Sequence, residues 1–213
     1  MSGGSTEGYE YEPIRGLPGN LPPGEHIIWQ GAPDWKRLAL TALHVRGVAF
    51  YFGLLALWAL IAGGTMGGVF ATALAAGIGV GLLCLLAWLS ARSTVYTLTN
   101  KRIVLRIGIA LPTCINIPLK IIDNAALKVH PDGTADMPLV IAGTSKLGWM
   151  MLWPHARPWK LSVPQPMLRA VPDGETVSAM LARALCEEVP DGRRSVGSTD
   201  GAARGPMGEA QAA

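Results

Sequence analysis

Hydrophobic and polar positions are distributed very unevenly along this chain. The 45 residues from Gly47 to Ala91 contain no Asp, Glu, Lys or Arg. A single helix of that length would measure about 68 Å, more than twice the roughly 30 Å hydrocarbon core of a bilayer. Four glycines among residues 63–68 interrupt the stretch near its middle, where they favour a turn. The pattern therefore predicts a transmembrane helical hairpin with two spans, at about residues 44–62 and 68–91.

After this stretch the pattern changes to short segments typical of strands. β-branched and aromatic residues separated by turn signals predict strands at 95–99, 102–107, 114–117, 125–129, 139–142, 148–152 and 167–171. One further short strand is expected within residues 25–33. From residue 174 onward, apolar residues recur at helical spacing and predict an amphipathic helix. These elements indicate an α+β domain, a small antiparallel barrel or bent sheet that the helix closes at one end.

The chain therefore divides into four segments. Residues 1–43 form an N-terminal segment with one short strand, residues 44–91 the hairpin, and residues 92–188 the α+β domain. Residues 189–213 are rich in Gly, Ala, Ser and Arg and almost lack bulky side chains, so we expect a disordered tail.

Charge gives the hairpin an orientation. Only 15% of the residues are charged and the mean hydropathy is +0.31, whereas a soluble protein has about 25% charged residues. Basic residues stand before the first span and after the second, and the turn between the spans has no charge. Because cytoplasmic flanks carry the excess of Lys and Arg, both termini are expected in the cytoplasm. The charge pattern thus predicts a multi-pass membrane protein, and the resemblance described below implies the inner (intracytoplasmic) membrane.

The segment after the hairpin is strongly basic. Residues 92–170 hold ten basic and three acidic side chains. A basic domain tethered under a membrane is attracted to anionic headgroups, so we expect lipid contacts from Arg92, Lys101, Arg102 and Arg106. Nucleic acid is not expected as a partner, because no nucleic-acid-binding module is recognisable.

Small residues recur on one face of the second span. Ala73, Gly77 and Gly81 lie four residues apart, a spacing that lets another helix approach closely in lipid. This face could pack against the protein's own first span or form a homodimer, and the sequence leaves both alternatives open.

Residues with catalytic or metal-binding chemistry are sparse. The three cysteines and four histidines have no metal-ligand spacing, and no nucleophile or phosphate-loop motif occurs. His44, at the edge of the first span, is either a pigment ligand or an interfacial histidine beside Arg46. Because these motifs are absent, we expect no enzyme activity, no cofactor and no metal.

A tryptophan-rich stretch, residues 149–160, is the most suggestive surface candidate. Alternation of Trp149, Met151 and Trp153 predicts a strand that points them into the core, whereas Arg157 and Trp159 are candidates for protein docking.

Two segments carry a resemblance to known families. Residues 96–103, YTLTNKRI, and residues 24–31, GEHIIWQG, resemble the bacterial pleckstrin-homology-like (PH-like) domain of membrane proteins. That resemblance implies a seven-stranded barrel with a C-terminal helix on the cytoplasmic side of a transmembrane pair. Residues 9–18, YEYEPIRGLP, and the following LPPGE resemble the PuhB family of photosynthetic complex assembly proteins.

The resemblance also implies a function. It is that of a non-catalytic, membrane-bound assembly factor or chaperone for the photosynthetic reaction centre and its core light-harvesting complex. The reaction-centre H subunit is then the expected partner. The basic residues alone support an alternative, a membrane-anchored module that binds anionic lipid headgroups and senses membrane composition.

Overall fold

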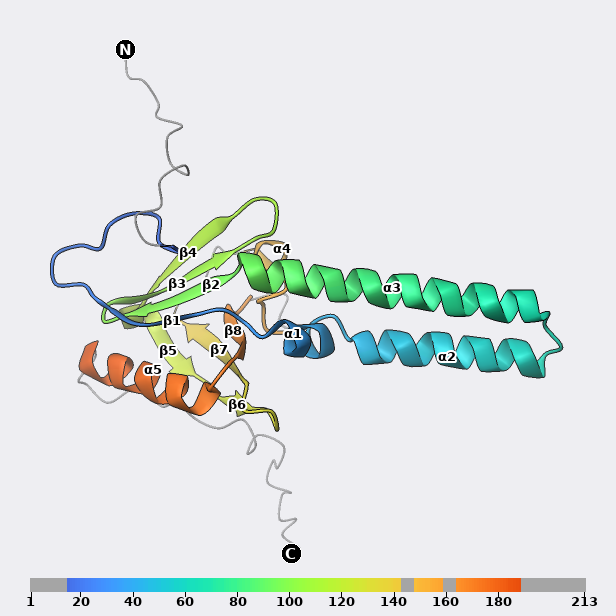
Figure 1. The fold of residues 1–213 in the computed structure, drawn as a ribbon. Helices are drawn as coiled ribbons and strands as arrows, with labels where there is room; N and C mark the ends of the chain where they lie inside the picture. The colour runs from blue at the N-terminus through green and yellow to red at the C-terminus, as the bar shows by residue number, and fades with distance from the viewer. Residues whose placement is uncertain (1–14, 143–147, 159–163, 189–213) are drawn as a thin grey trace, which may run out of the picture.

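A helical hairpin projects from one side of an α+β domain in the computed structural model (Figure 1). The structure describes residues 15–142, 148–158 and 164–188. Residues 9–14 of the segment that resembles the PuhB family, the docking candidate Trp159 and the expected disordered tail lie outside the described residues.

Three helices build the hairpin and its base: α1 (Trp35–Thr41), α2 (Val45–Ile61) and α3 (Met66–Ser93). The Asp34 side chain caps α1 by accepting a hydrogen bond from the Arg37 N–H at 2.8 Å. Thr65 caps α3 in the same way, through the Gly68 N–H at 3.2 Å. The two long helices pack side by side (Figure 1), and their bounds agree closely with the predicted helices.

Four antiparallel strands form the first sheet, in the order β1-β2-β3-β4. They are β1 (Ile27–Gly31), β2 (Val95–Thr99), β3 (Arg102–Ile107) and β4 (Thr113–Pro118). Asn100 in the β2–β3 turn holds the N-terminal segment in place. Its Oδ1 accepts from the His26 N–H and its Nδ2 donates to the Gly24 carbonyl, both at 3.0 Å. The segment before the hairpin therefore belongs to the same sheet as the segment after it.

The second sheet is built around one long strand. The central β7 (Ala135–Ile141) pairs with β5 (Ile122–Ala125), β6 (Lys128–Val129) and β8 (Met167–Val171), all antiparallel. A short 3-10 helix, η1 (Leu119–Ile121), separates β4 from β5, and α5 (Gly174–Glu188) packs against both β7 and β8.

The two sheets do not close into the barrel that was expected. Pro118 ends β4 and η1 redirects the chain, so β5 begins a separate sheet instead of extending the first one. The α+β class and the closing helix are confirmed. On α5, the apolar stripe of Val177, Leu181, Ala184 and Leu185 is buried in a core that both sheets share.

The strand predicted at residues 148–152 is wrong, because this segment forms the short helix α4 (Trp149–Leu152). One helical turn places Trp149 and Leu152 on the same side, and both pack against the core. Trp153 follows the helix and is exposed, not buried as the alternation predicted. Pro154 has no N–H for a strand ladder, which favours a turn here.

Candidate functional site

The end of the domain from which the hairpin leaves contains the most unusual chemistry in the described residues. Only Thr94 separates the end of α3 from the start of β2. On the other arm, α1 packs against both α3 and β8, and Ala39, Val45 and Ala87 form a small apolar cluster between the helices. The hairpin is therefore joined to the domain by packed contacts as well as by the chain.

A fully buried polar network lies directly below this junction. The Tyr96 hydroxyl is 2.7 Å from His155 Nδ1 and accepts a hydrogen bond from the Arg169 N–H at 3.2 Å. On the other side of the ring, His155 Nε2 is 3.1 Å from Thr94 Oγ1. Tyr96 can donate to Nδ1 while it accepts from Arg169, so the network assigns the proton of a neutral His155 to Nε2.

Burial keeps the Tyr96 hydroxyl and the His155 ring uncharged. Loss of solvation, with a smaller contribution from the Arg169 guanidinium, lowers the pKa of His155 to about 3. Burial likewise raises the pKa of the Tyr96 hydroxyl far above its ordinary value. Neither group changes its charge near neutral pH, so the pair is suited to holding α3, α4 and β8 together and not to proton transfer.

Two charged residues, Arg169 and Asp136, lie beside the neutral Tyr96–His155 pair and bond to separate groups. Arg169, 7% exposed, donates to the carbonyl oxygens of Pro154 and Thr41, both at 2.9 Å. Asp136 accepts from the Ala170 N–H at 2.8 Å and lies 3.0 Å from His130 Nε2. Arg169 thereby connects the second sheet to the last residue of α1, at the base of the hairpin.

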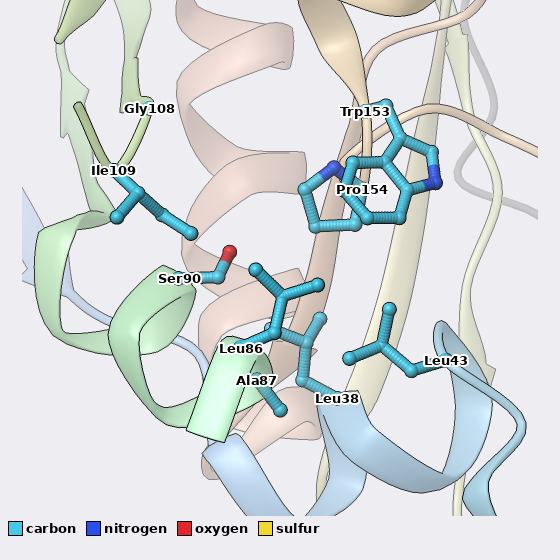
Figure 2. Close-up of a pocket in the computed structure, with 9 residues that line it drawn as sticks. All are labelled: Leu38, Leu43, Leu86, Ala87, Ser90, Gly108, Ile109, Trp153 and Pro154. Carbon is cyan, nitrogen blue, oxygen red and sulfur yellow. The ribbon is translucent and has the colours of Figure 1, made fainter. Parts of the chain in front are cut away.

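Three pockets border this junction in the described residues, and two of them differ in character. One, of about 280 Å³, is partly lined by Lys128, Arg157 and Arg169, with Asp136 as its acidic side chain. The other, of about 180 Å³, is lined mainly by residues with apolar side chains, with Ser90 as the exception. It lies between α1, α3, the β3–β4 turn and the Trp153–Pro154 segment (Figure 2).

The four basic residues predicted to contact lipid fall into two separate pairs. Arg92 lies at the end of α3, with its guanidinium 5.4 Å from the Trp88 ring centre, and Arg106 pairs with Val95 at the same end of the sheet. Lys101 and Arg102 lie at the opposite end of these strands. Five residues of extended strand, the separation between Lys101 and Arg106, measure about 17 Å. The lipid contact itself stays a prediction.

Lys101 and Arg102, the pair at the end far from the hairpin, form ion pairs with acidic side chains. Lys101 bonds to Glu188 at 2.7 Å and Arg102 to Glu25 at 2.8 Å. The hydrogen bond from Lys101, followed by that from Lys120, lowers the pKa of Glu188. These ion pairs link the N-terminal segment and α5 to the β2–β3 turn.

The small-residue face of α3 is turned away from α2. Ala73, Gly77 and Gly81 are exposed, and a Cβ placed on either glycine would meet no atom within 4 Å. Gly79 instead faces the other helix, because a Cβ placed on it would lie 4.0 Å from the Phe52 ring. The alternative in which this face packs on the protein's own first span is therefore not what the structure shows.

The remaining candidates are placed as follows. Arg157 donates to Gln165 Oε1 at 3.0 Å and lies at the rim of the basic pocket. His44 adopts a left-handed backbone conformation between α1 and α2, with Nδ1 3.3 Å from the Ala42 carbonyl. Within the described part of the chain, no three His, Cys, Asp or Glu side chains are grouped as a metal site.

Sequence reasoning missed the buried network. Its members come from four separate segments, and Tyr96 and His155 are 59 residues apart. The one signal available was a set of polar residues inside apolar strands, Arg169 between Leu168 and Ala170 above all.

Comparison with known proteins places the chain in a family. Residues 42–185 match the family described as bacterial PH domain. The chain belongs to the bacterial PH domain family. The match runs through α2 and α3, so in this PH domain protein the hairpin is part of the matched region.

One relative is similar along most of its length. The chain is 36% identical over 191 residues to a Rhodobacter capsulatus protein described as an uncharacterized 23.7 kDa protein in the puhA 5′ region, covering 84% of this chain and 88% of that one. Among solved structures, the hSac2 domain of human phosphoinositide phosphatase Sac2 aligns with a TM-score of 0.32 and 9% identity, over 56% of this chain and 72% of that one. A TM-score this low supports no conclusion about ligands.

Proposed function

We propose that this bacterial PH domain protein is a PuhB-type assembly factor for the photosynthetic reaction centre and its core light-harvesting complex. The observation that carries the proposal is the relative in the puhA 5′ region, similar along nearly the whole chain. The expected partner is the reaction-centre H subunit, and the function is that of a membrane-bound chaperone without catalysis.

The length and composition of the hairpin helices support a membrane crossing. α3 is long and apolar enough to cross a bilayer, and α1 with α2 meets the same criterion as a pair bent by 55°. If Ile61 and Met66 lie level across the turn, Trp58 is level with Val69. The 19 residue steps of α3 from Val69 to Trp88 then span about 29 Å, close to the roughly 30 Å hydrocarbon core.

Trp58 and Trp88 are both exposed, one near each end of the hairpin. Exposed tryptophans separated by the hydrocarbon thickness are typical of the two interfacial belts of a membrane protein. We therefore place the turn at residues 62–65 on the far side of the membrane and the whole α+β domain on the cytoplasmic side. A client would then be recognised from the cytoplasm.

Genetic complementation tests this function. Deletion of the relative's gene from Rhodobacter capsulatus should reduce the near-infrared absorbance of reaction centres and core antenna per cell, and expression of this chain should restore it. An unchanged absorbance in the deletion strain would contradict the proposal. Restoration of the absorbance by puhA alone, supplied on the same vector, would show that the loss was polar on puhA and unrelated to the protein.

Co-purification tests the partner. A tagged full-length chain, isolated from detergent-solubilised photosynthetic membranes, should recover the H subunit in an amount that grows when later assembly steps are blocked. Recovery of antenna polypeptides without the H subunit would move the proposed contact to a different component of the complex.

A further inference from the structure

Two of the most exposed apolar side chains in the described residues lie on the domain, outside the hairpin. Leu111 in the β3–β4 turn is 85% exposed, and Met150 on α4 is 83% exposed. Ile109 and Trp153, their neighbours on the same two segments, are exposed as well. Large apolar side chains with this exposure on a folded domain indicate an interaction surface.

Both segments lie at the end of the domain from which the hairpin leaves (Figure 1). Ile109 and Trp153 line the same apolar pocket as Leu86 and Ala87 of α3 (Figure 2). Residues that line one pocket lie close together, so the β3–β4 turn and the segment after α4 lie beside the last turns of α3.

The last turns of α3 correspond to the edge of the bilayer. Trp88 marks the cytoplasmic belt of the proposed spans, one residue from Ala87 in the pocket. At about 1.5 Å per residue, the five residue steps from Trp88 to Ser93 carry α3 some 8 Å further, which is about the thickness of one headgroup layer. The base of the domain is therefore at headgroup depth.

The sequence of the two segments suits this environment. Residues 107–119, which include the β3–β4 turn, contain no charged side chain, and residues 148–154 contain none either. Water-exposed turns are usually polar, with Asn, Asp, Gly and Ser. Arg92 next to Trp88, and Arg106 at the start of the uncharged stretch, supply cations at the same end for anionic headgroups.

We propose that the β3–β4 turn and α4 insert Ile109, Leu111, Met150 and Trp153 into the headgroup layer beside the hairpin. This insertion surface, defined by those four residues, is continuous with the lipid-facing surface of α3. It fixes the tilt of the domain on the membrane and leaves the opposite end, with Lys101, Arg102 and Glu188, facing the cytoplasm. The inference rests on the proposed membrane crossing of the hairpin.

Depth-dependent fluorescence quenching of the full-length protein tests the insertion surface. The environment-sensitive amino acid Anap would replace one residue at a time, in vesicles of phosphatidylcholine and phosphatidylglycerol, at Leu111, Met150, Ile78 or Ile121. Ile78 is the hairpin reference, near the middle of the proposed span. Ile121 is the matched domain control, a half-exposed apolar residue of η1 at the end far from the hairpin.

Doxyl-labelled lipid should quench the probe at Ile78, Leu111 and Met150, and aqueous iodide should quench it at Ile121 alone. Iodide quenching at Leu111 and Met150, with lipid quenching kept at Ile78, would overturn the insertion surface and leave the membrane anchor standing. Iodide quenching at Ile78 would instead overturn the membrane crossing, and with it both proposals. Because only lipid and the chain are present, a protein client cannot account for protection at Leu111.

Discussion

The hairpin and the domain are both rich in apolar residues, but the domain buries them and the hairpin leaves most of them exposed. Every residue of β2 and of β8 is buried. Of the 28 residues of α3, only Ala87, Ser90 and Ala91 are buried, and all three lie at the domain end. The domain therefore packs its apolar residues into a core, whereas the apolar surface of the hairpin is left for lipid to cover. Composition alone does not distinguish the two cases, and the packing does.

Replacing one leucine in each region with alanine tests this difference in burial most sharply. Leu105→Ala removes a fully buried side chain from the shared core and should lower the free energy of unfolding by about 2–5 kcal/mol. Leu82→Ala, on the exposed face of α3, should change it by less than about 0.5 kcal/mol. Chemical denaturation of the detergent-solubilised protein measures both. Equal losses would mean that the hairpin is packed against protein.

A charge in the hairpin should have an effect that the same charge in the domain does not. Ile78→Arg places a guanidinium near the middle of α3, at a cost of about 2.5–3.5 kcal/mol for membrane insertion. The fraction of protein that resists alkaline carbonate extraction should fall accordingly, and Ile78→Ala should behave as wild type. Ile121→Arg is the domain control and should leave extraction unchanged. An Ile78→Arg protein that stays fully integrated would count against the span.

The buried network offers a smaller test of how the domain holds the hairpin. Tyr96→Phe removes a hydroxyl bonded to both His155 Nδ1 and the Arg169 N–H, and leaves those buried groups without that partner. We expect a loss of about 1–3 kcal/mol in the free energy of unfolding. Tyr51→Phe, which removes a hydroxyl from an exposed ring on α2, should be neutral. A neutral Tyr96→Phe would show that the network is dispensable for stability.

Acid should weaken the domain through His155. The folded-state pKa, about 3, lies below the ordinary value of 6.5, so between these values the unfolded chain binds a proton that the folded chain does not. Stability from this group is complete above about pH 6.5 and falls as the pH drops toward 3. Between pH 6.5 and 5.5 the loss should be about 1 kcal/mol.

The matching variant is His155→Gln, which cannot take up the proton. Its unfolding free energy should be lower at neutral pH but should change less between pH 6.5 and 5.5 than that of the wild type. Other titrating groups contribute equally to both proteins, so the difference between the two slopes belongs to His155. Identical slopes would contradict a neutral, buried histidine.

Local pattern predicted much of the fold and little of the site. The bounds of α2 and α3, and strands such as β2 and β3, follow from periodicity and from the glycine-rich turn, which are properties of neighbouring residues. The open sheets, the Tyr96–His155 pair and the bond between Arg102 and Glu25, 77 residues apart, depend on contacts between distant segments. α4 was mistaken for a strand because four residues are too few to separate the two periods.

Access to the hairpin turn from each side of the membrane tests the central contrast most directly. In a background without the three native cysteines, one new cysteine would replace Thr65 in the turn or Asp123 on β5. A membrane-impermeant maleimide, added to intact cells with a permeabilised outer membrane, should label Thr65→Cys, and Asp123→Cys should react only after lysis. Labelling of both positions from the same side would contradict a hairpin that crosses the membrane twice.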